Sequence, residues 1–268
     1  MRDPDSTPRP TGRPRQSDRA AGSKVVDRAL DALVALAAQD GVTLTALAAA
    51  LQLAPSTTHR LLASLASRRL AEVDDATGQW TVGPGAYRLG AAFLRKSPLA
   101  ERAAPMLRQL AQTSGETAIL AVADGDGALI VAQAEPASAA RAALPQGTRL
   151  PMHTSAVGKA LICHLPLARV EALLGSDLPA LTPASLTDQG ALTADLATIR
   201  QVGAAFEAGE TDPHVNSIAA PVFGGGGDPV AAVGLAGPAA RLTQARMNQL
   251  GAELRQVADD LGRALGRD

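Results

Sequence analysis

The sequence has little of what several classes of protein depend on. Cys163 is the only cysteine among 268 residues, so an intramolecular disulfide is impossible, as is typical of a reducing cytoplasm. Aromatic residues make up only 2%, so any core is built from Ala, Leu and Val. No apolar run reaches the roughly 18 residues of a membrane span, and residues 1–23 lack the apolar stretch of a secretory signal. We therefore expect a cytoplasmic protein that does not enter the membrane.

The net charge of −1 conceals an asymmetry along the chain. Residues 1–98 contain 13 Lys and Arg against 9 Asp and Glu, whereas residues 99–268 contain 12 against 17. A basic N-terminal part is typical of proteins that bind a polyanion. Chance is the alternative explanation, because the difference is modest for this length, and the charge distribution alone does not decide between them.

Composition and hydrophobic periodicity divide the chain into four parts. Residues 1–23 are rich in Pro, Arg, Ser and Asp and lack periodicity, which predicts a disordered arm. Helical spacing followed by two short strands predicts one domain over residues 24–97. Residues 98–115 predict a linker helix, and the alternation of strands and helices over residues 116–268 predicts a second domain.

Residues 44–63 fit the spacing of a helix-turn-helix, in which two helices pack at a fixed angle over a tight turn. The positions that this motif buries are apolar: Leu47, Leu51, Leu53 and Leu61. The position where the helices touch is small, Ala48. Gln52 replaces the usual glycine of the turn, at a cost of about 1 kcal/mol of strain, and Thr58 replaces a larger apolar residue. The alternative is an ordinary helical hairpin in an Ala-rich bundle.

A strand–turn–strand follows the second helix and favours a winged helix-turn-helix that binds double-stranded DNA. The predicted strands are Leu70–Val73 and Gln79–Val82. The second helix and the base of the wing provide hydroxyl, imidazole and guanidinium groups for phosphates and base edges. The predicted DNA contacts are Ser56, Thr57, Thr58, His59, Arg60, Ser64, Arg68 and Arg69.

Arg13 and Arg15 flank Pro14 in an extended stretch that resembles arms lying in a narrow minor groove. The alternative is a solvated tail. We include both arginines among the candidate DNA contacts.

The second half predicts two strand pairs, Thr117–Ala123 with Leu129–Ala134 and Ile218–Phe223 with Val230–Ala236, joined by Gly-rich turns. Helical spacing separates the pairs and ends the chain over Gln244–Leu265. With the winged domain, this order predicts the α+β class.

Three stretches together resemble the IclR family of bacterial transcription regulators, above all its glyoxylate-responsive members. They are Leu44–Leu65 with Gly78–Gly83, Leu150–Ala160, and Ser217–Phe223 with Val233–Pro238. The resemblance covers about Val25 to Leu265. It implies a GAF-like effector domain with a curved antiparallel sheet flanked by helices, a homodimer or homotetramer, and a ligand-responsive regulator, in our reading a repressor.

The resemblance also implies where a small carboxylate effector binds. A helix begins at Ala156 and Val157, whose backbone N–H groups attract a carboxylate. Glu207 matches an acidic position and Ser217 a thiol position. Gly234 and Ala236 stand where hydroxyls occur in the glyoxylate-binding members. The loss of two hydroxyls implies a roomier, less polar pocket and puts a 2-oxo acid in doubt, although a larger carboxylate would fit.

Two other functions are compatible with parts of this sequence. Ser155 and Lys159 lie four apart, as a Ser/Lys-type hydrolase would require. A protein-interaction module that uses the helix-turn-helix for association is the second. We predict no enzyme activity, no cofactor and no metal site, because the four histidines and Cys163 lack the usual ligand spacing.

Overall fold

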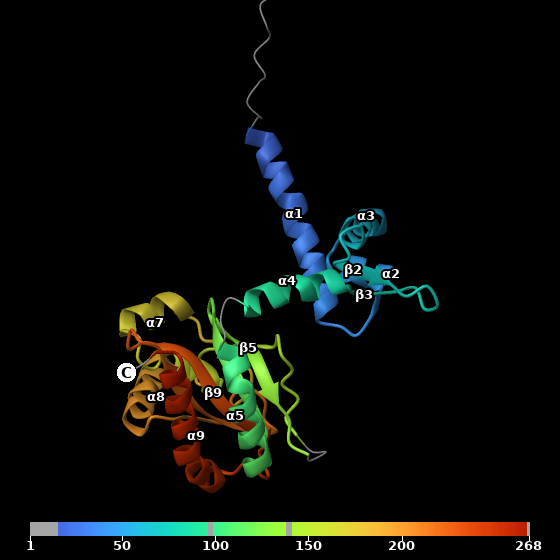
Figure 1. Ribbon diagram of the computed structural model, residues 1–268. Helices are drawn as coiled ribbons and strands as arrows, with labels where there is room; N and C mark the ends of the chain where they lie inside the picture. Colours follow the sequence, from blue (N-terminus) through green and yellow to red (C-terminus); the bar gives the residue numbers. More distant parts are fainter. Residues whose placement is uncertain (1–15, 96–98, 138–140, 267–268) are drawn as a thin grey trace, which may run out of the picture. The chain divides into compact units, whose positions relative to one another are not determined.

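The computed structural model describes residues 16–95, 99–137 and 141–266 (Figure 1). The chain separates into residues 1–96, here the N-terminal unit, and residues 97–268, here the C-terminal unit. The described part contains no helix that is long and apolar enough to cross a membrane.

The N-terminal unit is a helix-turn-helix with a three-stranded sheet of order β1-β3-β2. Its elements are α1 (Gln16–Ala37), β1 (Val42–Thr43), α2 (Leu44–Ala50), α3 (Pro55–Ala66), β2 (Ala71–Val73), β3 (Gln79–Val82) and α4 (Pro84–Leu94). Ala32, Leu36, Leu47, Leu62 and Trp80 belong to its core. The paired strands β2 and β3 form the predicted wing.

Local sequence accounts for the ends of these helices. The Thr43 side chain caps α2 by accepting a hydrogen bond from Ala46 N at 3.3 Å, and Pro55 opens α3 as its first residue. Gln52 adopts φ +54° in the turn between them. The left-handed backbone that the motif requires is therefore present, with a side chain where glycine avoids strain.

Helix α1 begins at Gln16, inside the segment that we expected to be a disordered arm as far as residue 23. Ala20 and Ala21 are strong helix formers. They extend the helix upstream of the point where apolar periodicity starts, and for this reason periodicity placed the boundary too late.

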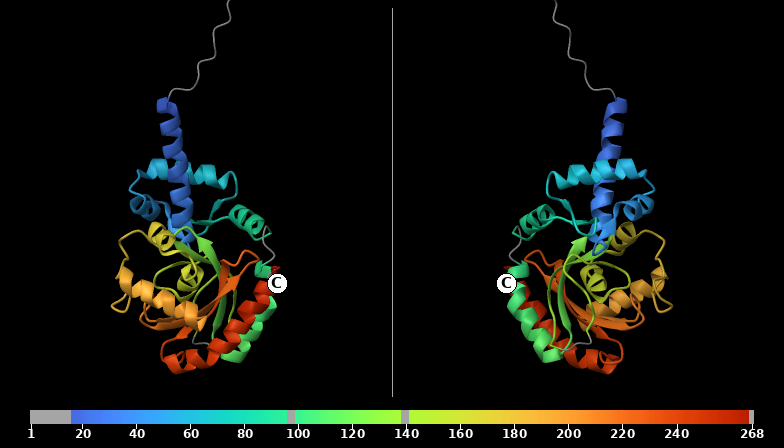
Figure 2. Two further views of the ribbon diagram at one scale, coloured as in Figure 1. Left: turned by 90° about the vertical axis from the view of Figure 1, so that its left-hand side faces the viewer. Right: turned by 90° about the vertical axis from the view of Figure 1, so that its right-hand side faces the viewer.

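The C-terminal unit is a six-stranded antiparallel sheet of order β6-β5-β4-β9-β8-β7 with helices on both faces (Figure 2). The strands are β4 (Thr117–Asp124), β5 (Gly127–Ala134), β6 (Arg149–Pro151), β7 (Ala205–Ala208), β8 (Val215–Phe223) and β9 (Pro229–Pro238). The helices are α5 (Leu99–Ser114), α6 (Ala156–Ile162), α7 (Leu167–Leu174), α8 (Gln189–Val202) and α9 (Gln244–Ala264). The α+β class and both predicted strand pairs are confirmed.

Alternate residues of each strand enter two separate cores. In β4, Leu120 packs with α5 and α9 on one face, whereas Ile119 packs with α6 and α8 on the other. This is the period of two expected for a sheet covered on both sides. The predicted linker helix is α5, but Leu107 and Leu110 are buried in the first core. This burial makes α5 part of the C-terminal unit.

Candidate functional site

Helix α3 presents most of the predicted DNA contacts to solvent. Ser56, His59, Arg60 and Ser64 are exposed and Thr57 is half-buried. Leu61, Leu62 and Leu65 are buried on the opposite face. The helix is therefore amphipathic in the manner of a recognition helix, with its core face fixed by leucines and its polar face free for a partner.

Thr58 does not belong to this face, and its assignment as a DNA contact was wrong. Its side chain is 0% exposed, and its hydroxyl donates to Ala54 O at 3.3 Å within the helix. The helical period decides this, because residue 58 shares the core face with residues 61, 62 and 65.

A groove of about 500 Å³ runs between α1 and α3. It is lined by Val25, Val26, Arg28, Ala29, Leu30, Thr57, Arg60, Leu61, Ser64, Leu65 and Arg68. The groove is therefore lined by Arg60 of α3, Arg28 of α1 and Arg68 of the turn after α3, together with two hydroxyl residues, whereas Ser56 and His59 lie outside it. Arg13 and Arg15 lie outside the described residues.

Arg68 and Arg69 lie in the turn that follows α3, at the base of the wing. Arg68 Nη1 donates to Ser64 O at 3.4 Å. Arg69 is left-handed at φ +58°, and its carbonyl accepts from Gly85 N at 2.7 Å. A side chain at Gly85 would place Cβ 2.6 Å from that oxygen, so glycine permits the close approach that fixes the wing beside α3.

A carboxylate, that of Asp74, stabilises the turn at the tip of the wing. Asp74 Oδ1 accepts from Ala76 N at 2.8 Å and from Thr77 N at 3.0 Å. Hydrogen bonds from the backbone N–H groups of Thr77 and Ala76 hold the pKa of Asp74 below its usual value. The basic groups near the wing are thus at its base, not at its tip.

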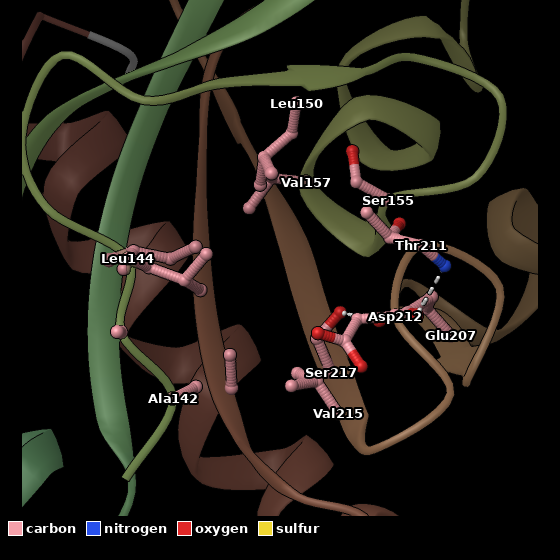
Figure 3. Close-up of a pocket in the computed structure, with 13 residues that line it drawn as sticks. Ala142, Leu144, Leu150, Ser155, Val157, Glu207, Thr211, Asp212, Val215 and Ser217 are labelled. Atoms are coloured by element: carbon pink, nitrogen blue, oxygen red, sulfur yellow. Dashed lines mark hydrogen bonds between the residues drawn. The ribbon is translucent and has the colours of Figure 1, made fainter. Parts of the chain in front are cut away.

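The C-terminal unit contains a pocket of about 340 Å³ between the sheet and the segment that precedes α6 (Figure 3). Its lining residues are Ile119, Ala142, Ala143, Leu144, Leu150, Ser155, Val157, Glu207, Thr211, Asp212, Val215, Ser217 and Ala236. Aliphatic side chains form one side, and hydroxyls with two carboxyls form the other. Such a lining suits a small ligand that has an apolar part and a polar part.

Sheet register brings the polar side together. Glu207 of β7 pairs with Ser217 of β8, and Ser217 pairs with Ala236 of β9. Ser217 Oγ donates to Glu207 Oε2 at 2.6 Å, and Thr211 N donates to Glu207 Oε1 at 3.1 Å. Glu207 is 2% exposed, and burial raises the pKa of its carboxyl despite these hydrogen bonds.

Behind the polar side of the pocket lies an ionic cluster centred on Lys159, which is 1% exposed. Lys159 Nζ is 2.8 Å from Glu210 Oε1 and 2.9 Å from Asp195 Oδ2, and it donates to Phe206 O at 2.7 Å. Burial raises the pKa of Glu210, although Lys159 opposes the shift. The cluster joins α6 to α8 and to the loop after β7.

The Ser/Lys dyad of a hydrolase is not formed. Ser155 Oγ donates to Pro151 O at 2.6 Å and accepts from Gly158 N at 3.1 Å as the cap of α6. Lys159 Nζ is engaged by carboxylates instead, so it cannot serve as a base for Ser155. The described residues also contain no group of three or more His, Cys, Asp or Glu that would hold a metal ion.

Four of the six residues predicted from the resemblance line the pocket: Val157, Glu207, Ser217 and Ala236. Ala156 is buried beside them without lining it. Gly234 faces α6, because a Cβ there would lie 3.0 Å from Val157 Cγ1. The sequence reasoning missed Asp212 and the segment 142–144, which carry no motif and reach the pocket only through folding.

Comparison with known proteins agrees with this architecture. The family model for the bacterial transcriptional regulator IclR C-terminal domain matches residues 91–263, and that for the IclR helix-turn-helix domain matches residues 25–75. The HTH-type transcriptional regulator BhcR of Paracoccus denitrificans is 42% identical over 260 residues, covering 94% of this chain and 93% of that protein.

Two further relatives extend the comparison. The HTH-type transcriptional repressor AllR of Escherichia coli is 34% identical over 261 residues, covering 95% and 96% of the two chains. A crystal structure of a homologue from Microbacterium hydrocarbonoxydans, in complex with 4-hydroxybenzoate, has the same fold. Its TM-score is 0.74 at 23% identity, with 90% of this chain and 99% of that chain covered.

Proposed function

Because the chain belongs to the IclR family of bacterial transcription regulators, we propose that it is a repressor that a small carboxylate releases from DNA. The pocket in the C-terminal unit, with hydroxyls and carboxyls on one side, is the observation that carries the effector half of this proposal. As in other regulators of this kind, the chain acts in the cytoplasm and has no enzymatic activity of its own.

The exposed face of α3 supports the DNA half. Its hydroxyls and Arg60 enter the major groove, and Arg68 and Arg69 at the base of the wing contact phosphates. Short hydroxyl side chains near the N-terminus of a helix reach phosphates and base edges, while arginine donates two parallel hydrogen bonds to guanine.

The effector carboxylate lies near the start of α6, where Ala156 and Val157 provide N–H groups that lack intrahelical partners. Glu207 and Ser217 contact its other polar atoms. Ala236 offers no hydroxyl, and Gly234 is covered by Val157. A carboxylate with an apolar body therefore suits the pocket better than a compact 2-oxo acid. 4-Hydroxybenzoate, which the Microbacterium homologue binds, has this form.

A homodimer, alone or as half of a homotetramer, places two α3 helices on paired half-sites. Helix α1 offers a surface for it. Val26, Leu30 and Val34 recur at intervals of four and are 57%, 55% and 71% exposed. An apolar stripe on a helix whose other face is already buried is typical of an interface between copies.

We expect Leu30→Glu to shift the protein from dimer toward monomer and to reduce operator affinity by about tenfold or more, because the stripe would bury a charge. Sedimentation velocity and operator binding measure the two effects. Val230→Glu, at an exposed apolar residue of the C-terminal unit (46%) away from the DNA-binding elements, is the matched control. A Leu30→Glu protein that dimerises like the wild type would place the interface elsewhere.

The direct test is binding to a DNA fragment from the protein's own upstream region, titrated against salt and then against small carboxylates. The affinity should fall steeply with salt, with a log–log slope near −0.9 for each phosphate neutralised, and a carboxylate that binds the pocket should lower it further. Salt-independent binding would contradict the DNA half. Release by no small carboxylate would contradict the effector half.

A further inference from the structure

The buried cluster behind the pocket has more acids than bases. Lys159 is the one ammonium, and it faces Asp195 of α8 and Glu210 of the loop after β7 at 2.9 and 2.8 Å. Glu207 of β7 is the third carboxyl of the cluster, close enough for Lys159 to influence it electrostatically. If all three carboxyls were ionised, the cluster would carry a net charge of −2 on mostly buried side chains, of which only that of Asp195 is substantially exposed, at 31%, and this is costly.

Glu207 is the member of this cluster that lines the pocket and that has no basic partner. Both ion pairs of Lys159 go to the other two acids. The two oxygens of Glu207 accept instead from Ser217 Oγ and Thr211 N, as the dashed lines in Figure 3 mark. Among the described residues, no Lys or Arg lies within 4.0 Å of its carboxyl.

The pocket itself also lacks a compensating cation. Its lining residues include two carboxyls, Glu207 and Asp212, and no lysine, arginine or histidine. Asp212 is exposed, so solvent screens it. An anionic ligand that enters this space therefore meets the charge of Glu207 at close range in a poorly solvated wall, where repulsion between like charges is strong.

We propose that Glu207 takes up one proton from solvent when a carboxylate effector binds, so that the pocket accepts monocarboxylates and binds them more weakly as the pH rises. This inference rests on the proposed effector class. The proton lies on a carboxyl oxygen of Glu207, which changes from an acceptor into a donor toward the ligand. A dicarboxylate would bring a second charge for which no lining residue offers a partner.

Burial of the Glu207 carboxyl in this wall already favours its neutral form, because burial raises the pKa of Glu207. Lys159 and the hydrogen bonds from Ser217 and Thr211 act in the opposite direction. Below the pKa of Glu207 in the free protein, affinity is constant. Above it, binding must include protonation, so the affinity falls by up to about tenfold per pH unit.

Calorimetric titration of the full chain tests this with two probes, glyoxylate and 4-hydroxybenzoate, between about pH 5.5 and pH 8, where neither carboxylate titrates. Buffers of different ionisation enthalpy count the protons exchanged. For the wild type we expect a proton uptake that approaches one proton per pocket at the upper end of this pH range. For Glu207→Gln we expect no uptake, a flat pH profile, and at about pH 8 an affinity roughly tenfold above that of the wild type.

Asp212→Asn is the matched control, because it removes a carboxyl of the pocket lining that is exposed to solvent. This variant should show the same proton uptake as the wild type and the same decrease of affinity with rising pH. Binding without proton uptake, or a Glu207→Gln protein that is folded by circular dichroism but binds more weakly at every pH, would overturn the inference. The second result would show that ionised Glu207 accepts a hydrogen bond from the ligand. If neither protein bound either probe, the effector class would fail together with it.

Discussion

Replacing Lys159 by methionine lowers the free energy of unfolding of the C-terminal unit by about 3–5 kcal/mol near pH 8. The substitution keeps the aliphatic stem but removes the ammonium that Glu210 and Asp195 share. Two carboxylates then remain without a counter-charge, Glu210 largely buried and Asp195 with 31% of its side chain exposed. The loss should be smaller near pH 5, because the pKa of Glu210 is already raised by burial, and protonation then removes part of the unpaired charge.

The chain offers a convenient way to assign this loss. Its one tryptophan, Trp80, and its one tyrosine, Tyr87, both lie in the N-terminal unit. Fluorescence therefore follows that unit, while circular dichroism follows both. In urea, Lys159→Met should move the unfolding of the C-terminal unit, followed by circular dichroism, to lower urea concentration. The fluorescence transition of the N-terminal unit should stay where it is in the wild type. A shift of the fluorescence transition by the same amount would show instead that the two units unfold together.

Two variants complete the experiment. Lys24→Met makes the same change at an exposed position and should alter stability by less than about 0.5 kcal/mol. In Lys159→Met/Glu210→Gln/Asp195→Asn, the stranded charges are gone, so most of the loss should be recovered. A loss below about 1 kcal/mol for the single variant at pH 8 would mean that the cluster is solvated.

Arg60→Ala should weaken binding to the specific operator by about 1–3 kcal/mol, or roughly 5- to 150-fold, and relax the preference at one base position. Arg60 is exposed on α3 and borders the groove beside α1, together with Thr57 and Ser64. We expect its guanidinium to donate to a guanine edge, and α3 contains no other arginine that could replace it. The measurement is a titration against the operator and a set of single-base variants.

Arg88→Ala is the control. Arg88 is an exposed arginine on α4, so its replacement removes the same positive charge at a position outside α3. It should cause at most a small loss, equal for all sequences. If Arg60→Ala also weakened all sequences equally and lowered the salt slope by about one phosphate, Arg60 would be a phosphate contact. The base-reading residues would then lie on the Ser56 and His59 side of the helix.

Short-range rules accounted for much of the N-terminal unit. The cap at Thr43, Pro55 at the start of α3 and the left-handed Gln52 each depend on a few consecutive residues, so spacing alone located them. The same rules fail where a contact comes from far along the chain. Strand β1 has two residues and exists only because Val42 pairs with Trp80, and two residues are too few for an alternating pattern to appear.

The pocket shows the same difference between residues that local patterns locate and residues that only long-range contacts place. The residues matched through the family motif, such as Val157 and Ser217, lie on regular elements and were placed from the sequence. Leu144 and Asp212 lie on connecting segments that show no pattern, and they reach the pocket because the sheet brings β4, β8 and β9 together. Lys159 is the clearest case, since the helical spacing that suggested a Ser155 partner is equally compatible with the two carboxylates that it contacts.

The sequence by itself determined the helix-turn-helix, the wing, the two central hairpins of the C-terminal unit and the family, because these follow from periodicity and from motifs a few residues long. Only the tertiary structure decided that Thr58 is buried, that Gly234 faces Val157 rather than the pocket, and that Lys159 pairs with Asp195 and Glu210 while Glu207 stays without a basic partner. Charge balance in an interior depends on which distant residues exclude water together, and that is a property of the folded chain, not of any local pattern.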